Sequence, residues 1–198
     1  MGTMRLRKRL AVIKRAGRVA LAVLTIQLVG APATQARGAA QGGAEGEARA
    51  ALQQAFERLR AGDYGGVYDA LPTASQRRVT RGRFVEALGK ARGHFELSGM
   101  EIERAHVVGN LAVMDTVVYA TVRKPVEAEG KIVSRQYMVR EGGRWRVTTG
   151  DGSTVRPLLA ANPAFARQYP ATEPRVYLKR DGRWINLSAL QGSRRRGK

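Results

Sequence analysis

The chain has 198 residues, of which 43% are hydrophobic, so it can form one folded domain with appended segments but not two large domains. It contains no cysteine, which excludes disulfides, thiolate catalysis and cysteine-ligated metals, and it has only two histidines, too few for a multi-histidine zinc site. We therefore expect no bound metal and no cofactor. The formal net charge of +19 favours partners that carry negative charge.

Residues 1–36 have the basic, apolar and small-residue order of a secretory signal peptide. Seven Lys and Arg residues and no acid precede an apolar stretch at 19–31, and Ala31-Pro32-Ala33 supplies the small residues of a cleavage site. We expect export to the periplasm or the exterior after cleavage near Ala33 to Ala36. Because the apolar stretch is shorter than the roughly 20 residues that span a membrane, an uncleaved membrane anchor is the second alternative and a basic tail on a cytosolic protein the third.

Removal of the signal peptide lowers the formal charge from +19 to +12. Four of the remaining positive charges lie in residues 191–198, which we expect to form a disordered basic tail. The other basic residues are interspersed with acids, and the chain lacks the stripe of aromatic and basic residues that single-strand binders use. These features favour attraction to an anionic envelope surface over binding of nucleic acid.

Three helices are expected in the first half of the chain. Residues 37–47 are rich in Gly, Ala, Gln and Glu, which is typical of a flexible linker. Apolar residues then recur at helical spacing over 48–59, 64–71 and 84–91. Thr80 is the expected N-cap of the third helix, which begins just before its apolar stripe.

The next part of the chain predicts an antiparallel run of strands. The longest strand, 111–123, carries apolar residues on both faces, which is typical of a central strand that is covered on both sides. The first strand is expected to break near Ser98-Gly99. The four strands are expected over 96–108, 111–123, 131–140 and 144–149.

Residues 151–190 are expected to form a C-terminal extension. Residues 155–161 favour a short helix, and Asn162-Pro163 opens a helical turn that continues through Tyr169. Residues 175–187 form a hairpin around an Asp-Gly turn at Asp181. This hairpin either extends the sheet or covers one of its edges.

Three segments within about residues 48–150 carry a resemblance to a known family: Phe56-Glu-Arg-Leu-Arg-Ala-Gly-Asp-Tyr64, Val108-Gly-Asn-Leu-Ala-Val113 and Gly142-Gly-Arg-Trp-Arg-Val147. With three helices followed by a long antiparallel meander, this region resembles the nuclear transport factor 2-like (cystatin-like) superfamily. The resemblance implies an α+β fold in which three N-terminal helices pack on a curved antiparallel sheet to form a cone. It says little about activity, because this fold hosts enzymes, ligand carriers and assembly modules.

Asp115 and Tyr119 are the best catalytic candidates, because they lie four residues apart and share one face of the central strand. If that face were concave, a carboxylate and a phenol would stand in an apolar pocket and could abstract a proton beside a carbonyl. Alternation instead places the smaller and more apolar set, Ala112, Met114 and Thr116, inward. We therefore expect Asp115 and Tyr119 to face outward.

The expected function is that of an exported, non-catalytic domain that binds a small apolar ligand or mediates protein association through its sheet, for example as a homodimer. The alternative is an enzyme similar to ketosteroid isomerase or a dehydratase that uses Asp115 and Tyr119. The residues expected to line a ligand pocket are Tyr68, Phe84, Met114, Thr116, Val118, Tyr137 and Trp145.

Overall fold

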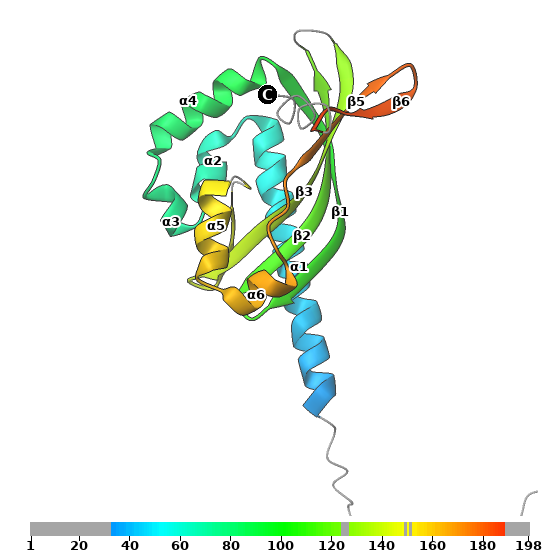
Figure 1. Cartoon of the computed structure of the whole chain (residues 1–198). Coiled ribbons are helices and arrows are strands. Elements are labelled where there is room, and N and C mark those ends of the chain that lie inside the picture. Colours follow the sequence, from blue (N-terminus) through cyan, green and yellow to red (C-terminus); the bar gives the residue numbers. More distant parts are fainter. Residues whose placement is uncertain (1–32, 124–126, 149, 151, 189–198) are drawn as a thin grey trace, which may run out of the picture. The chain divides into compact units, whose positions relative to one another are not determined.

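A computed structural model describes residues 33–123, 127–148, 150 and 152–188, with side chains from residue 42 onward. The expected basic tail and nearly all of the expected signal peptide lie outside the described residues. The described part has the expected α+β class, with helices and one open antiparallel sheet (Figure 1). None of the helices in this part is long and apolar enough to cross a membrane.

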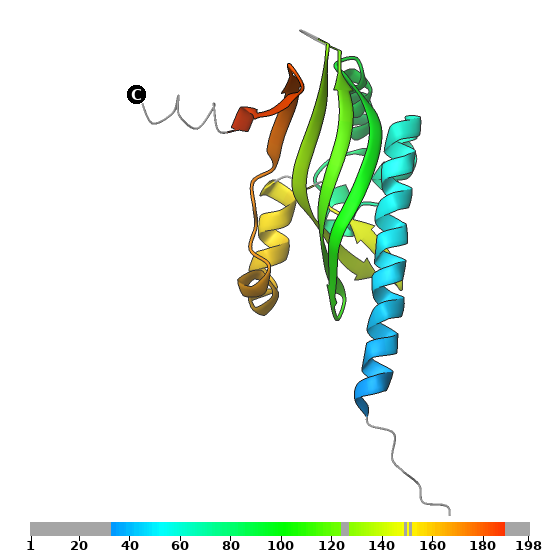
Figure 2. The same ribbon diagram turned by 90° about the vertical axis from the view of Figure 1, so that its right-hand side faces the viewer.

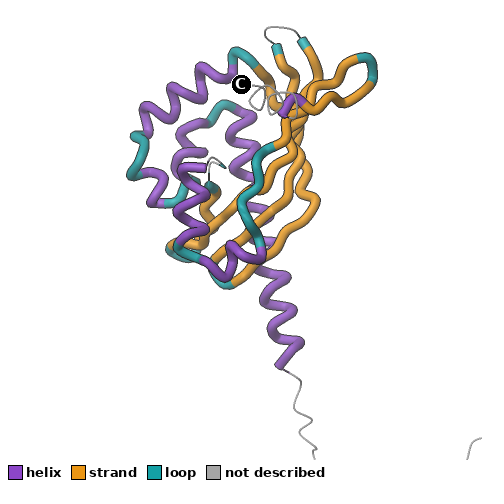
Figure 3. The backbone as a smooth tube through the Cα atoms, in the orientation of Figure 1, coloured by secondary structure: helices purple, strands orange, loops and turns teal. Residues whose placement is uncertain are grey.

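In the described part of the chain, four helices precede the sheet, one more than expected, and Figure 3 shows helices and strands in different colours. Thr80 caps the last of them by accepting a hydrogen bond from the Arg83 amide, as its sequence position predicts. Asp63 caps the second in the same way, because its carboxylate accepts from the Gly66 amide at 2.8 Å. The helices are α1 (Ala33–Ala61), α2 (Tyr64–Asp69), α3 (Thr73–Gln76) and α4 (Arg81–Arg92).

Residues 37–47 belong to α1 and are not the flexible linker that their composition suggested. Ala, Gln and Glu are good helix formers, and the Glu45 carboxylate pairs with Arg49 one turn later at 3.0 Å. Ala48 is fully buried against the sheet, and Ala44 packs beside the same cluster. Packing on the sheet therefore stabilises a helix that its four glycines would otherwise weaken.

The sheet has six antiparallel strands in the order β1-β2-β3-β5-β6, with β4 also paired to β3. β1 is irregular between Leu97 and Gly99, as expected, and again between Ile102 and Arg104. The strands are β1 (Phe95–Val108), β2 (Leu111–Val122), β3 (Ala128–Glu141), β4 (Arg144–Val147), β5 (Arg175–Arg180) and β6 (Arg183–Asn186).

The outer edge of β3 is shared by two strands. Its end at Met138–Glu141 pairs with β4, and Gly130–Val133 pairs with β5. The C-terminal hairpin therefore extends the sheet, which was one of the two expected arrangements. Its turn forms at Asp181 and Gly182, which both have positive φ (50° and 74°).

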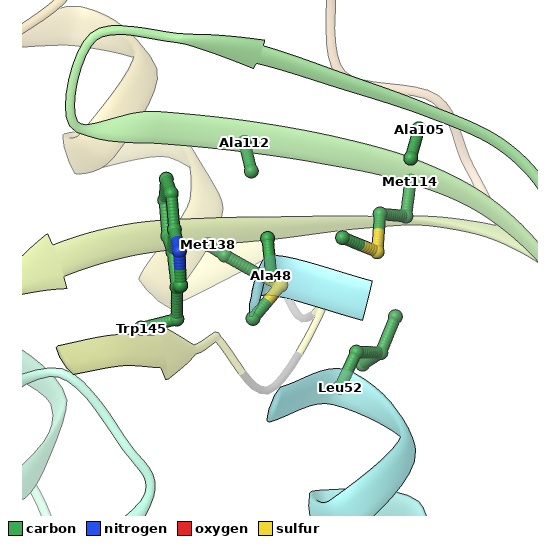
Figure 4. Close-up of a cluster of buried hydrophobic side chains, with 7 residues drawn as sticks. All are labelled: Ala48, Leu52, Ala105, Ala112, Met114, Met138 and Trp145. Carbon is green, nitrogen blue, oxygen red and sulfur yellow. The ribbon is translucent and has the colours of Figure 1, made fainter. Parts of the chain in front are cut away.

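Helices cover the central strand on both faces, as its two apolar faces predict. Figure 2 shows α1 on one side of the sheet and α5 (Gly152–Ala160) and α6 (Pro163–Gln168) on the other. On the α1 side, Met114 of β2 and Met138 of β3 are buried with Trp145 against Ala48 and Leu52 (Figure 4). The opposite cluster consists of Val113, Tyr137, Val155, Leu159 and Phe165.

Candidate functional site

A cavity of about 340 Å³ lies between the N-terminal helices and the face of the sheet that α1 covers. Fifteen of its eighteen lining residues are apolar, and no titratable side chain is among these eighteen. The apolar residues come from α1, α2, α4 and the strands: Leu52, Ala55, Phe56, Leu59, Val67, Ala70, Leu71, Phe84, Leu88, Phe95, Leu97, Met100, Val118, Ile132 and Val147.

The cavity exists because α4 does not pack closely on the sheet. No residue of α4 is buried, although Phe84 and Leu88 form its apolar stripe and line the cavity. Across from them, Phe95 and Ile132 remain 37% and 38% exposed. Apolar side chains on both walls are therefore in contact with solvent, and a molecule that fills the cavity would remove this surface from water.

Ser134, Gln136 and Thr148 supply the three polar side chains of the lining. Gln136 Nε2 donates a hydrogen bond to Ser134 Oγ at 3.1 Å. The hydroxyl of Thr148 is buried and has no hydrogen-bond partner among the described residues. A few polar groups in an apolar lining can orient a ligand, because each forms a hydrogen bond only when a polar atom of the ligand lies within reach.

A smaller recess of about 210 Å³ adjoins this cavity. The two share Leu59, Leu88, Phe95 and Leu97 as lining residues. The recess differs in charge, since its other lining residues are Arg60, Tyr64, Arg92, Glu96 and Arg123. The site therefore combines an apolar cavity with a neighbouring basic recess.

The candidate catalytic residues line neither hollow. Asp115 lies on the opposite face of β2, where its carboxylate accepts a hydrogen bond from Arg135 Nε at 2.9 Å. The hydroxyl of Tyr119 donates to Glu101 Oε2 at 3.2 Å. Desolvation, followed by the charge and hydrogen bond of Glu101, raises the pKa of Tyr119 above its ordinary value, which makes the phenol a weaker acid at neutral pH. The structure therefore does not bring the two residues together in an apolar pocket.

Of the seven side chains expected to line a pocket, Phe84 and Val118 do so. Tyr68 packs its ring 5.7 Å from that of Phe84, but its hydroxyl donates to the carbonyl oxygens of Gln76 and Val79 and so holds the α3–α4 connection. Tyr68 is therefore a structural residue between helices rather than part of the cavity wall.

The other four expected residues are buried away from the cavity surface. Met114 and Trp145 belong to the core beneath α1, and Thr116 is completely buried, with its hydroxyl donating to the Ser134 carbonyl at 3.1 Å. Tyr137 lies in the cluster on the other face. Both faces of β2 carry buried residues, and Ala48 and Leu52 of α1 pack against Met114, so this part of the strand is core and not cavity wall.

The lining residues that the sequence did not indicate include the apolar stripe of α1 and one residue of α4. Leu52, Phe56 and Leu59 form the apolar stripe that predicted a helix, and the same stripe forms one wall of the cavity. Leu88 has the equivalent position in α4. A periodic apolar stripe indicates which side of a helix faces inward, but not how much space is left beside it.

The described residues contain no group of three or more His, Asp or Glu side chains that could hold a metal ion. Comparison of the chain with protein-family models gave no match, and comparison with curated proteins gave none either. The geometry of the cavity and its recess is therefore the basis for assigning a function.

Proposed function

We propose that this protein binds a small apolar ligand in the cavity between its N-terminal helices and its sheet. The observation that carries the proposal is the lining itself, in which fifteen of eighteen residues are apolar and Phe95 and Ile132 remain partly exposed. The cavity volume of about 340 Å³ is at the lower end of the range of about 300–1,000 Å³ for ligand pockets.

The position of this cavity also supports membership of the nuclear transport factor 2-like superfamily and its cone-shaped arrangement. In members of that superfamily, as in this protein, helices on one face of an antiparallel sheet enclose a pocket with apolar walls. The cavity lies on the face of β2 that bears Val118, and α1, α2 and α4 surround it. A binding role within this fold needs no catalytic group in the cavity.

Binding is favoured over catalysis because the lining has no titratable side chain. General acid–base catalysis needs such a group within hydrogen-bond reach of the reacting atom. Asp115, the candidate base, pairs with Arg135 on the other face of the sheet. Neither Asp115 nor Tyr119, the residues of an isomerase-like or dehydratase-like alternative, lines the cavity or the recess.

We further propose that the protein acts after export, on the basis of the signal-peptide pattern in residues 1–36. Its basic character would then draw it to anionic envelope surfaces. Apolar molecules are sparingly soluble in water, so an exported carrier would need such a cavity to hold them.

Binding can be tested with the full chain and a neutral apolar dye, N-phenyl-1-naphthylamine, whose fluorescence rises in apolar surroundings. We expect a saturable increase with one dye per chain, and displacement of the dye by dodecanol. Native mass spectrometry would show the same stoichiometry. A linear, non-saturating response would contradict the proposal, since it would indicate only weak adsorption to exposed apolar side chains.

A further inference from the structure

We infer that the ligand is a single-chain amphiphile with one negative charge, of the fatty-acid class, and that Arg92 binds its head group. This inference rests on the proposed function, because it assigns the apolar chain to the cavity. It adds the charge of the ligand and the residue that recognises that charge.

The first argument is the adjacency of the two hollows. The cavity and the recess share Leu59, Leu88, Phe95 and Leu97, so the two hollows are adjacent, and the end of an apolar chain in the cavity lies beside the recess. The cavity has no titratable group in its lining, whereas the recess has four charged ones. A molecule that fits both must be apolar along one part and charged at one end.

The second argument is the charge of the recess. Arg123 forms an ion pair with Glu96, and Arg60 forms one with Glu57 at 2.7 Å. Arg92 has no acidic partner among the described residues. One uncompensated positive charge is left beside the cavity, which favours a singly charged anion over a neutral or doubly charged ligand.

The third argument is the way Arg92 is positioned. It is the last residue of α4, and its guanidinium group lies against Gly62, where a Cβ atom would clash with Arg92 Nη1. Gly62 has a φ of 84°, which also favours glycine at this position. The turn after α1 thus leaves space for the guanidinium, whose planar donors match the two oxygens of a carboxylate.

The test compares dodecanoate with dodecanol, which has the same chain length but no charge, using dye displacement on the full chain at low salt. We expect dodecanoate to bind about fivefold more tightly than dodecanol, the size of effect that a solvent-accessible ion pair gives. Arg92→Gln should remove this preference and leave the affinity for dodecanol unchanged, because Arg92 does not line the cavity. Arg92→Lys should keep most of the preference because it keeps the charge.

Arg83→Gln is the matched control, since it removes the same charge from an exposed position of the same helix that lines neither hollow. It should leave the preference for dodecanoate intact. Equal affinities for the two probes in the wild type, or an equal loss in Arg92→Gln and Arg83→Gln, would overturn the assignment of Arg92 while leaving the apolar site in place. Failure of both probes to displace the dye would overturn the proposed function and this inference together.

Discussion

Asp115 and Arg135 are direct partners in the β2–β3 register, and the Asp115 carboxylate accepts a hydrogen bond from Arg135 Nε at 2.9 Å. Arg135 also donates from Nη1 to the Pro170 carbonyl at 3.2 Å. The pair therefore links the centre of the sheet to the segment that follows α6. This arrangement gives Asp115 a structural role on the face opposite the cavity.

Asp115→Asn should lower the free energy of unfolding by about 1–2 kcal/mol, because the pair is only partly exposed and Arg135 would lose its charged partner. Denaturant unfolding at neutral pH measures this loss. Asp69→Asn, which breaks a well exposed pair with Arg81, should cost at most about 0.5 kcal/mol. Ligand affinity should not change in either variant, and a large loss of affinity in Asp115→Asn alone would argue for a direct role of Asp115.

Tyr137→Phe should destabilise the protein by about 1–2 kcal/mol at neutral pH. The Tyr137 side chain is buried, and its hydroxyl donates to the Pro170 carbonyl at 2.8 Å and to the Tyr169 carbonyl at 3.2 Å. The variant leaves these two carbonyl oxygens without that donor. The loss should be visible in denaturant unfolding without a change in its slope.

The same variant should alter the stability at high pH. Burial raises the pKa of Tyr137 above its ordinary value of 10.0, although the nearby Arg135 charge opposes the shift. The unfolded chain therefore loses this proton at a lower pH than the folded protein, so the contribution of Tyr137 to stability is complete below pH 10.0 and is lost as the pH rises through the folded-state pKa. The difference between wild type and Tyr137→Phe should shrink above pH 10.0, and a constant difference would contradict this cause.

Val118→Phe should weaken binding of the neutral dye about tenfold, because the larger side chain occupies the cavity that Val118 lines. Thr121→Phe places the same ring on the opposite face of β2, away from the cavity lining, and is the matched control. Dye titration of both variants measures the difference. Equal affinities in the two variants would place the bound dye elsewhere on the molecule.

Met114→Ala should lower the free energy of unfolding by about 2–5 kcal/mol, because Met114 is fully buried between β2 and α1 and its removal leaves a void. Met100→Ala should cost less, since Met100 is only partly buried and borders the existing cavity. Thermal or denaturant unfolding of both variants gives the comparison. A smaller loss for Met114 than for Met100 would mean that α1 is not held on the sheet as described.

Local features of the fold were predictable from the sequence because they depend on neighbouring residues. The Thr80 N-cap and the positive φ at Gly182 follow from the chemistry of single positions. The central position of β2 follows from its two apolar faces. In contrast, the extension of α1 through residues 37–47 depends on packing of Ala44 and Ala48 against a sheet that comes later in the chain.

The cavity could not be predicted for the same physical reason. Its volume depends on how closely α4 approaches the sheet, and the spacing of apolar residues along a helix does not determine that distance. Val118 and Phe84 were identified because inward-facing apolar residues are good candidates for any interior surface. Met114 and Trp145 satisfy the same criterion but are in direct contact with other core side chains. Composition alone therefore could not distinguish residues that line the cavity from residues that are packed in the core.

The pairing of Gly130–Val133 with β5 has a consequence for self-association. Without the C-terminal hairpin, this part of β3 would present unpaired amide and carbonyl groups beside Ile132 and Val133, which is a template for strand addition by another molecule. The hairpin moves the free edge to β6, a strand of only four residues that begins with Arg183. Short edge strands resist such pairing, so the C-terminal hairpin replaces a longer template for strand addition with a shorter one.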